Sequence, residues 1–323
     1  MLFRSYNRSY TTGHKAYRAR SVVEIGNWVG WENAHDTIYA GALDIAVGPR
    51  WHSVYEMACN VVTIFIEGKE VHAVPQGGTT ERERALLANT GMVSESEELI
   101  DALVRQHEPA YIEKISALLL AGKSPRRIID VIQLAAAQVV LETDGPNNFS
   151  MPQHTYEYCN TLGWFFDNFA HPQRLKLLYV AGSMVNQAAW NQRSSGWLKS
   201  GTINTLRGAD RLTGGQIIER LEAALTALDA AQSVAWTKAY LDSGADRALL
   251  AQRLALMAAR FGNDPHNQEI PQCLLEDYGK NQCRDRERLL LACAHISAGH
   301  RKYGDPFDAS RRFGEAMGLV ELQ

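Results

Sequence analysis

The sequence predicts an all-α protein, built of repeated helical pairs that form a compact α-helical bundle or a short α-solenoid. Apolar residues recur at helical spacing along most of the chain, as in the stripe that runs through 217–228. Helix-start signals precede several of these runs. Strand signals are scarce: the runs 61–66 and 71–74 could pair as one hairpin, but the first run equally continues a helix.

Local signals indicate where the helices begin. Ser124 is a good N-cap, and Pro125 after it fits the first helical position. The Ser-Glu-Ser-Glu run at 94–97 places acids in a first turn, and Gly214 opens another helix. Gly, Pro, Asn and Ser gather in three expected loops, at 144–152, 193–201 and 262–271.

Composition excludes several classes of protein. The 323 residues are 46% hydrophobic, enough for a substantial core, and 33 Lys plus Arg against 36 Asp plus Glu exclude a strongly basic nucleic-acid binder. The five cysteines include no Cys-x-x-Cys pair, which disfavours a disulfide framework and a zinc ribbon. No apolar run reaches the roughly 18 residues that a membrane span needs. We therefore expect a cytoplasmic protein with no nucleic-acid or membrane partner.

The first 32 residues form an expected basic arm, in which no acid precedes Glu24. The arm lacks the apolar region of a secretory signal, so we expect it to lie on the domain or on a partner subunit. A homodimer is compatible with this reading. Residues 33–323 are expected to form one helical domain with internal duplication, in units of about 33–105, 106–200 and 214–323.

The duplication appears as repeated spacing. Residues 128–137 match 250–259 at a step of 122, and a second match has a step of 119. Residues i, i+4 and i+8 share a helix face, so each copy predicts a stripe whose first turn faces a cavity and whose later turns enter the core. The pairs at a step of 119 are His35 and His154, Tyr39 and Tyr158, Leu43 and Leu162, and His52 and His171.

If the two His-Tyr faces converge on one cavity, they form a catalytic site of His35, Tyr39, His154 and Tyr158. Imidazole ligates iron, copper or zinc, and histidines from separate helices are a usual way to build a metal site in a bundle. Iron is the cofactor we expect if a metal is bound. The expected metal ligands are His35, His154 and His295, with His52 and His171 as second choices.

A metal-free alternative uses the same residues, with His as a general base and Tyr as an acid or hydrogen-bond donor. A cavity lined by aromatic residues would then bind a flat hydrophobic substrate. Dinucleotide, phosphate-loop and nucleophile-elbow motifs are absent, and a di-iron carboxylate pattern is not supported. The candidate lining residues are Trp31, Trp51, Trp164, Phe165 and Phe166.

The stretch 118–190 resembles the helical region attached to some Rieske-type ferredoxin-like proteins. The shared features are an apolar helix at 128–141, a loop, a helix start with His154 and Tyr158, and a further helix at 175–186. More distantly, these His- and Tyr-rich helices look like those of questin-oxidase-like proteins, which act on polycyclic aromatic substrates. The resemblance implies redox chemistry. The chain has no Cys-x-His with a later Cys-x-x-His, so it carries no Rieske cluster of its own.

The leading hypothesis is an oxidoreductase, either an oxygenase or an oxidase, that acts on a small apolar or aromatic molecule and works with a redox partner protein. One alternative is a non-catalytic helical interaction or scaffold protein, because stacked helices present concave binding surfaces. A further alternative is a metal-dependent hydrolase that uses the dipeptide His35-Asp36.

Overall fold

The structure, a computed structural model, describes residues 14–46, 96–143, 151–171, 174–199, 203, 206–261, 265–298 and 306–318. Every regular element in these ranges is a helix, and the one extended pairing among them is an isolated bridge between Thr143 and Leu198. The all-α prediction is therefore confirmed. Residues 1–13, the possible hairpin at 61–74 and the candidate residues Trp51 and His52 lie outside the described ranges.

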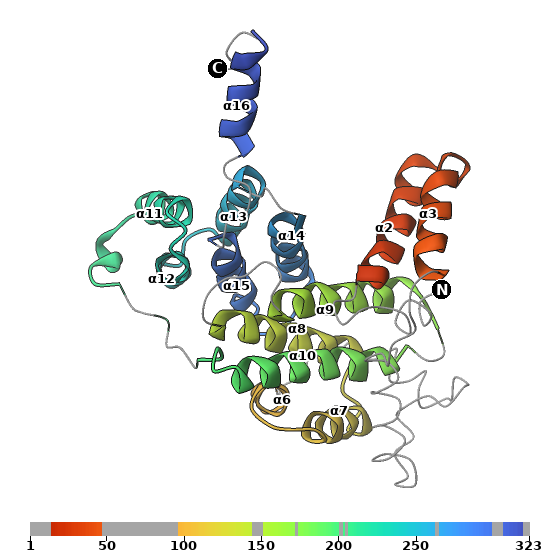
Figure 1. Ribbon diagram of the computed structural model, residues 1–323. Helices are drawn as coiled ribbons and strands as arrows, with labels where there is room; N and C mark the ends of the chain where they lie inside the picture. The colour runs from red at the N-terminus through yellow and green to blue at the C-terminus, as the bar shows by residue number, and fades with distance from the viewer. Residues whose placement is uncertain are drawn as a thin grey trace. The chain divides into compact units, whose positions relative to one another are not determined.

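The helices follow one another along the chain as Figure 1 labels them, with two short 3-10 turns, η1 (Trp31–Asn33) and η2 (Ala209–Arg211). The α-helices are α2 (His14–Val29), α3 (His35–Ala46), α6 (Ser96–Val104), α7 (Ala110–Leu120), α8 (Pro125–Glu142), α9 (Met151–Asn168), α10 (Lys176–Ser194), α11 (Gly214–Thr226), α12 (Ala230–Asp242), α13 (Arg247–Phe261), α14 (Pro265–Lys280), α15 (Arg288–Ser297) and α16 (Pro306–Ala316).

The described helices form two compact units. Unit 1 contains α2, α3, α6, α7, α10 and most of α8 and α9, together with 281–283. Unit 2 contains α11 to α16 and the ends of α8 and α9 that flank their connection. Helix α2, which falls within the expected arm at 1–32, belongs to unit 1. The repeat-based units remain a prediction, and α13 begins 122 residues after α8.

Two predicted helix starts are confirmed. Helix α8 begins at Pro125, and the backbone N–H of Arg127 donates to Ser124 Oγ at 3.4 Å. Helix α11 begins at Gly214 behind a capping box in which Thr213 is the N-cap. The expected apolar stripe at 217–228 loses its last member, because α11 ends at Thr226. Leu228 lies after the helix, with a positive φ of 60° and 38% of its surface exposed.

Helix α10 supplies the C-terminal cap of α6. Asn186 Nδ2 donates to the carbonyls of Leu103 and Gln106, both at 2.9 Å. Arg193 donates to the carbonyls of the two residues between them. The last carbonyls of a helix have no partner within the helix, so α10 satisfies them and fixes the end of α6 in unit 1.

Asp130 of α8 is the centre of a buried polar network. Its side chain is fully buried, and its carboxylate pairs with Arg126 and, at 2.9 Å, with Arg127. The carboxylate also accepts a hydrogen bond of 3.1 Å from the backbone N–H of Gln282, and Asn281 Nδ2 donates to the Asp130 carbonyl at 3.0 Å. Burial raises the pKa of this carboxyl, and the guanidinium groups and the N–H oppose the rise. The network holds residues 281 and 282 against α8.

Helix α15 is the most deeply buried element of unit 2. It packs against α12, α13 and α14, and Leu289, Leu290 and Cys293 have no exposed surface. Burial raises the pKa of the Cys293 thiol to about 12, which keeps this cysteine protonated and unreactive. The centre of this unit is therefore an apolar core.

We expect Asn186→Ala to lower the free energy of unfolding by about 1–3 kcal/mol, because the buried carbonyl of Leu103 at the end of α6 and the carbonyl of Gln106 just after it lose their donor. Urea unfolding followed by circular dichroism measures the loss. Asn191→Ala, at an exposed position of the same helix, is the matched control and should change the value by less than about 0.5 kcal/mol. Equal unfolding midpoints for the two variants would contradict the capping role.

We expect Asp130→Asn to destabilise the protein by about 3 kcal/mol, because Arg127 is left as a buried cation without its carboxylate. The same urea experiment applies. Asp167→Asn is the control: its carboxylate pairs with Arg126 at 2.8 Å but is one-third exposed, so its loss should cost at most about 1 kcal/mol. A smaller effect at Asp130 than at Asp167 would show that the network does not hold the fold.

Candidate functional site

Helix α9 carries more polar side chains into the interior than an apolar helical core would hold. His154, Glu157 and Tyr158 expose only 2%, 1% and 3% of their surfaces. Polar residues are rarely buried this fully unless they are paired or functional. The other polar residues of α9 that are at least nine-tenths buried are Gln153, Thr155, Asn160 and Thr161.

The three ionisable side chains share one face of the helix. Successive residues turn by about 100°, so His154, Glu157 and Tyr158 fall within about 100° of arc. An imidazole and a carboxylate exchange protons, and a phenol donates a hydrogen bond. The first two turns of α9 therefore carry a base, an acid and a donor on one face in a buried environment.

Several buried polar atoms on α8 and α9 have no hydrogen-bond partner within the described part of the chain. They include Gln133 Nε2, Thr155 Oγ1 and Thr161 Oγ1. A buried polar atom left unpaired costs about 1–3 kcal/mol, and water or a bound polar molecule would recover that cost. The interior around these two helices is therefore better suited to a polar guest than to close apolar packing.

Helices α8 and α9 approach closely at a glycine. A Cβ atom at Gly163 would lie 3.0 Å from Gln133 Nε2 and 3.5 Å from Ile129. Gly163 therefore permits the contact between the two helices at a point where a larger residue would push them apart.

Helix α2 is anchored to the second half of α9. Arg20 Nη1 donates to Asn160 Oδ1 at 2.6 Å, and the guanidinium lies 5.5 Å from the centre of the Trp164 ring. Arg20 also pairs with Glu24 of its own helix at 3.1 Å. Part of the expected basic arm is therefore a helix whose Arg20 is buried against α9.

The three expected metal ligands lie on three different helices. His35 lies at the start of α3 with a side chain that is 88% exposed, whereas His154 is buried and His295 belongs to α15. Among the described residues, no three His, Cys, Asp or Glu side chains form a group that could hold a metal ion. His154 and Glu157 lie three residues apart on α9, and both are buried.

The first copy of the His-Tyr face differs from the second. Tyr39 and Leu43 of α3 expose 66% and 50% of their surfaces, so the expectation that this stripe enters the core is wrong for the first copy. The sequence gives the same spacing in both copies, but spacing cannot say what covers a face. His171, the second-choice ligand after α9, is also exposed.

Two of the aromatic residues expected to line a cavity, Trp164 and Phe165, belong to a cluster at the end of α9. Trp164 meets Phe165 edge to face, with ring centres 5.1 Å apart, and both ring centres lie 5.8 Å from that of Phe169. Trp31, a third expected lining residue, is 49% exposed at η1.

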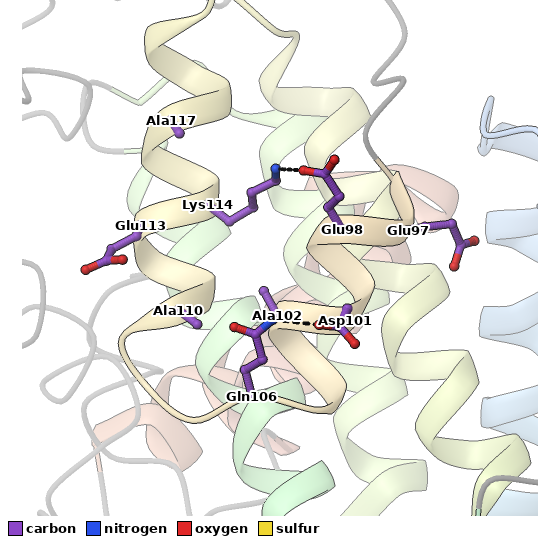
Figure 2. Close-up of a pocket in the computed structure, with 9 residues that line it drawn as sticks. All are labelled: Glu97, Glu98, Asp101, Ala102, Gln106, Ala110, Glu113, Lys114 and Ala117. Atoms are coloured by element: carbon purple, nitrogen blue, oxygen red, sulfur yellow. Dashed lines mark hydrogen bonds and ion pairs between the residues drawn. The ribbon is translucent and has the colours of Figure 1, made fainter.

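A second candidate surface is an open groove between α6 and α7, with a volume of about 680 Å³ (Figure 2). The ion pair between Lys114 and Glu98 crosses from α7 to α6. Gln106 donates to Asp101 at 2.6 Å along α6 and the turn after it. The lining residues are Glu97, Glu98, Asp101, Ala102, Gln106, Ala110, Glu113, Lys114 and Ala117.

Sequence reasoning missed this groove, although its acidic side was visible. The position of Glu97 in the first turn of a helix is enough to explain that acid. The additional acid at 101, one turn further along the same face, was a signal that α6 presents a negative surface. The neighbouring helix α7, which completes the groove, could not be inferred from spacing.

Comparison with known proteins gives no relative: no family model, no curated protein and no solved structure matches this chain. Within the described ranges, no helix combines the length and the apolar character that a bilayer crossing requires.

The pKa of His295 predicts a pH dependence of stability. Burial lowers it to about 4, from the ordinary value of 6.5 that the unfolded chain retains. Between these values the unfolded state binds a proton that the folded state does not, so stability is full above pH 7 and falls as the pH drops toward 4. The loss is at most about 3 kcal/mol and is reduced by the partial exposure of the ring.

Urea midpoints measured between pH 7 and pH 4 test this expectation. His295→Gln should flatten the decline, whereas His171→Gln, which changes an exposed imidazole, should leave it unchanged. Parallel curves for wild type and His295→Gln would refute the lowered pKa.

Proposed function

We propose that the protein is an all-helical enzyme that binds a small molecule against the buried polar face of α9 and oxidises it. The observation that carries the proposal is the burial of His154, Glu157 and Tyr158 on one turn of one helix. Ionisable groups that remain in an interior at a cost in stability are typical of catalytic sites.

The roles follow from the chemistry of the side chains. His154 acts as the general base that removes a proton from the substrate, and Glu157, on the adjacent face, orients the imidazole or stabilises its charged form. Tyr158 donates a hydrogen bond to an oxygen of the substrate. Trp164 and Phe165, further along the helix, give the substrate an apolar boundary.

The reaction class depends on the resemblance of 118–190 to helical regions of redox proteins. An oxidase would pass two electrons and two protons from the substrate to O2 and release hydrogen peroxide. An oxygenase would place an oxygen atom of O2 in the product. If iron is bound, His154 and Glu157 would be two of its ligands instead of acting as base and partner, and the iron would supply the route to O2, with a redox partner protein as electron donor for the oxygenase.

A second candidate function is a non-catalytic interaction protein, and the open groove between α6 and α7 favours it. The metal-dependent hydrolase hypothesis has less support, because the described residues place no third ligand beside His35 and Asp36. We place the enzyme in the cytoplasm, as expected for a chain with five cysteines and no Cys-x-x-Cys pair. A homodimer remains part of the proposal.

Oxygen uptake with a panel of hydroxyanthraquinones, with and without added Fe²⁺, tests the proposed enzyme. We expect His154→Gln to reduce turnover by a factor of about 100 or more, because a general base is worth that much in rate. Tyr158→Phe should reduce turnover by a factor of about 10, because it removes one hydrogen-bond donor to the substrate. His35→Gln and Tyr39→Phe, at exposed positions of α3, are the matched controls and should stay within about twofold of wild type. Full oxygen uptake by a folded His154→Gln variant would rule out the assigned base.

A further inference from the structure

We propose that the groove between α6 and α7 binds the basic N-terminal arm of the same chain, residues 1–13. The proposal stands apart from the enzymatic function, because the groove belongs to different helices from the α9 face. The groove would be the binding surface, and residues 1–13 would be its ligand.

Acidic side chains line the groove, and small alanine side chains lie among them. Four carboxylates line it against one ammonium group, that of Lys114, which is already paired with Glu98. Figure 2 shows Glu97 and Glu113 pointing outward on opposite sides. Alanines at 102, 110 and 117 leave room between the helices, and a volume of about 680 Å³ suits a few side chains of a peptide.

The arm is the complementary segment of this chain. Arg4 and Arg8 are its charged residues, and three aromatic side chains lie among and beside them. Arginine binds carboxylates through a planar fork that can make two parallel hydrogen bonds. Farther along, in α2, Lys15 and Arg20 are buried, Arg20 against α9, whereas Arg18 is exposed on the helix itself. Arg4 and Arg8 are the two cationic side chains that the arm itself would bring to an acidic surface.

The length of the arm allows this contact within one molecule. Thirteen extended residues span about 43 Å. The arm leads directly into α2, which belongs to the same compact unit as α6 and α7. A compact unit of fewer than 200 residues has a radius of gyration of about 16 Å, so the arm reaches across it. A tether of this length gives an effective concentration in the millimolar range, at which weak ion pairs suffice for binding.

A labelled peptide with the sequence of residues 1–13 tests the proposal on the full chain. In fluorescence anisotropy it should bind the chain carrying Arg4→Glu and Arg8→Glu, whose own arm no longer blocks the groove, at least tenfold more tightly than wild type. Binding should weaken as salt rises. Adding Glu97→Lys and Glu113→Lys to that chain should abolish binding, and a peptide with both arginines changed to glutamate should then restore it.

The matched control adds Asp210→Lys and Glu219→Lys instead, which make the same charge change at exposed positions outside the groove. It should bind the unmodified peptide as the reversed-arm chain does. Equal binding to wild type and reversed-arm chains, no binding to either, or binding that survives the groove substitutions would each overturn the proposal. A wild-type dimer in sedimentation that is lost on reversing the arm would place the arm on a second copy, and the intramolecular contact would be wrong.

Discussion

The buried carboxylate of Asp130 is the constraint on which the arrangement of unit 1 depends. A charge with no access to water must be surrounded by donors, and here two arginines of its own helix and a backbone N–H provide them. Arg126 extends the network to Asp167 of α9 at 2.8 Å. One buried charge therefore fixes the position of α9 and of residues 281–282 relative to α8 within unit 1.

These hydrogen bonds and ion pairs explain how α9 tolerates buried polar side chains in its first half. Its second half is held from two sides, by Arg20 at Asn160 and Trp164 and by Arg126 at Asp167. The position of α9 therefore depends less on apolar packing around His154 and Glu157. Helices whose ends are fixed in this way can keep ionisable groups in an interior at a cost that the rest of the fold offsets.

The sequence predicted the helices well because helix formation is governed by local signals. The pair Ser124-Pro125 and the capping box at Thr213 each act within four residues. The candidate site was predicted only in part. His154 is buried as expected and His35 is not, although both stand in the same local pattern. The decisive contacts of Asp130 lie up to 152 positions away, beyond the reach of any periodicity.

The difference between the two copies of the His-Tyr pattern indicates which histidine can act as a catalytic group. An imidazole at the 88% exposed position of His35 is solvated, so its basicity and geometry are set by water. An imidazole at the position of His154 is set by its protein neighbours, and only such a group can be held in one orientation against a substrate. If the chain arose by duplication, the copy that retained a catalytic arrangement is the one that became enclosed. The convergence of two equivalent faces is then unnecessary, because a single helix already carries a base, a carboxylate and a phenol.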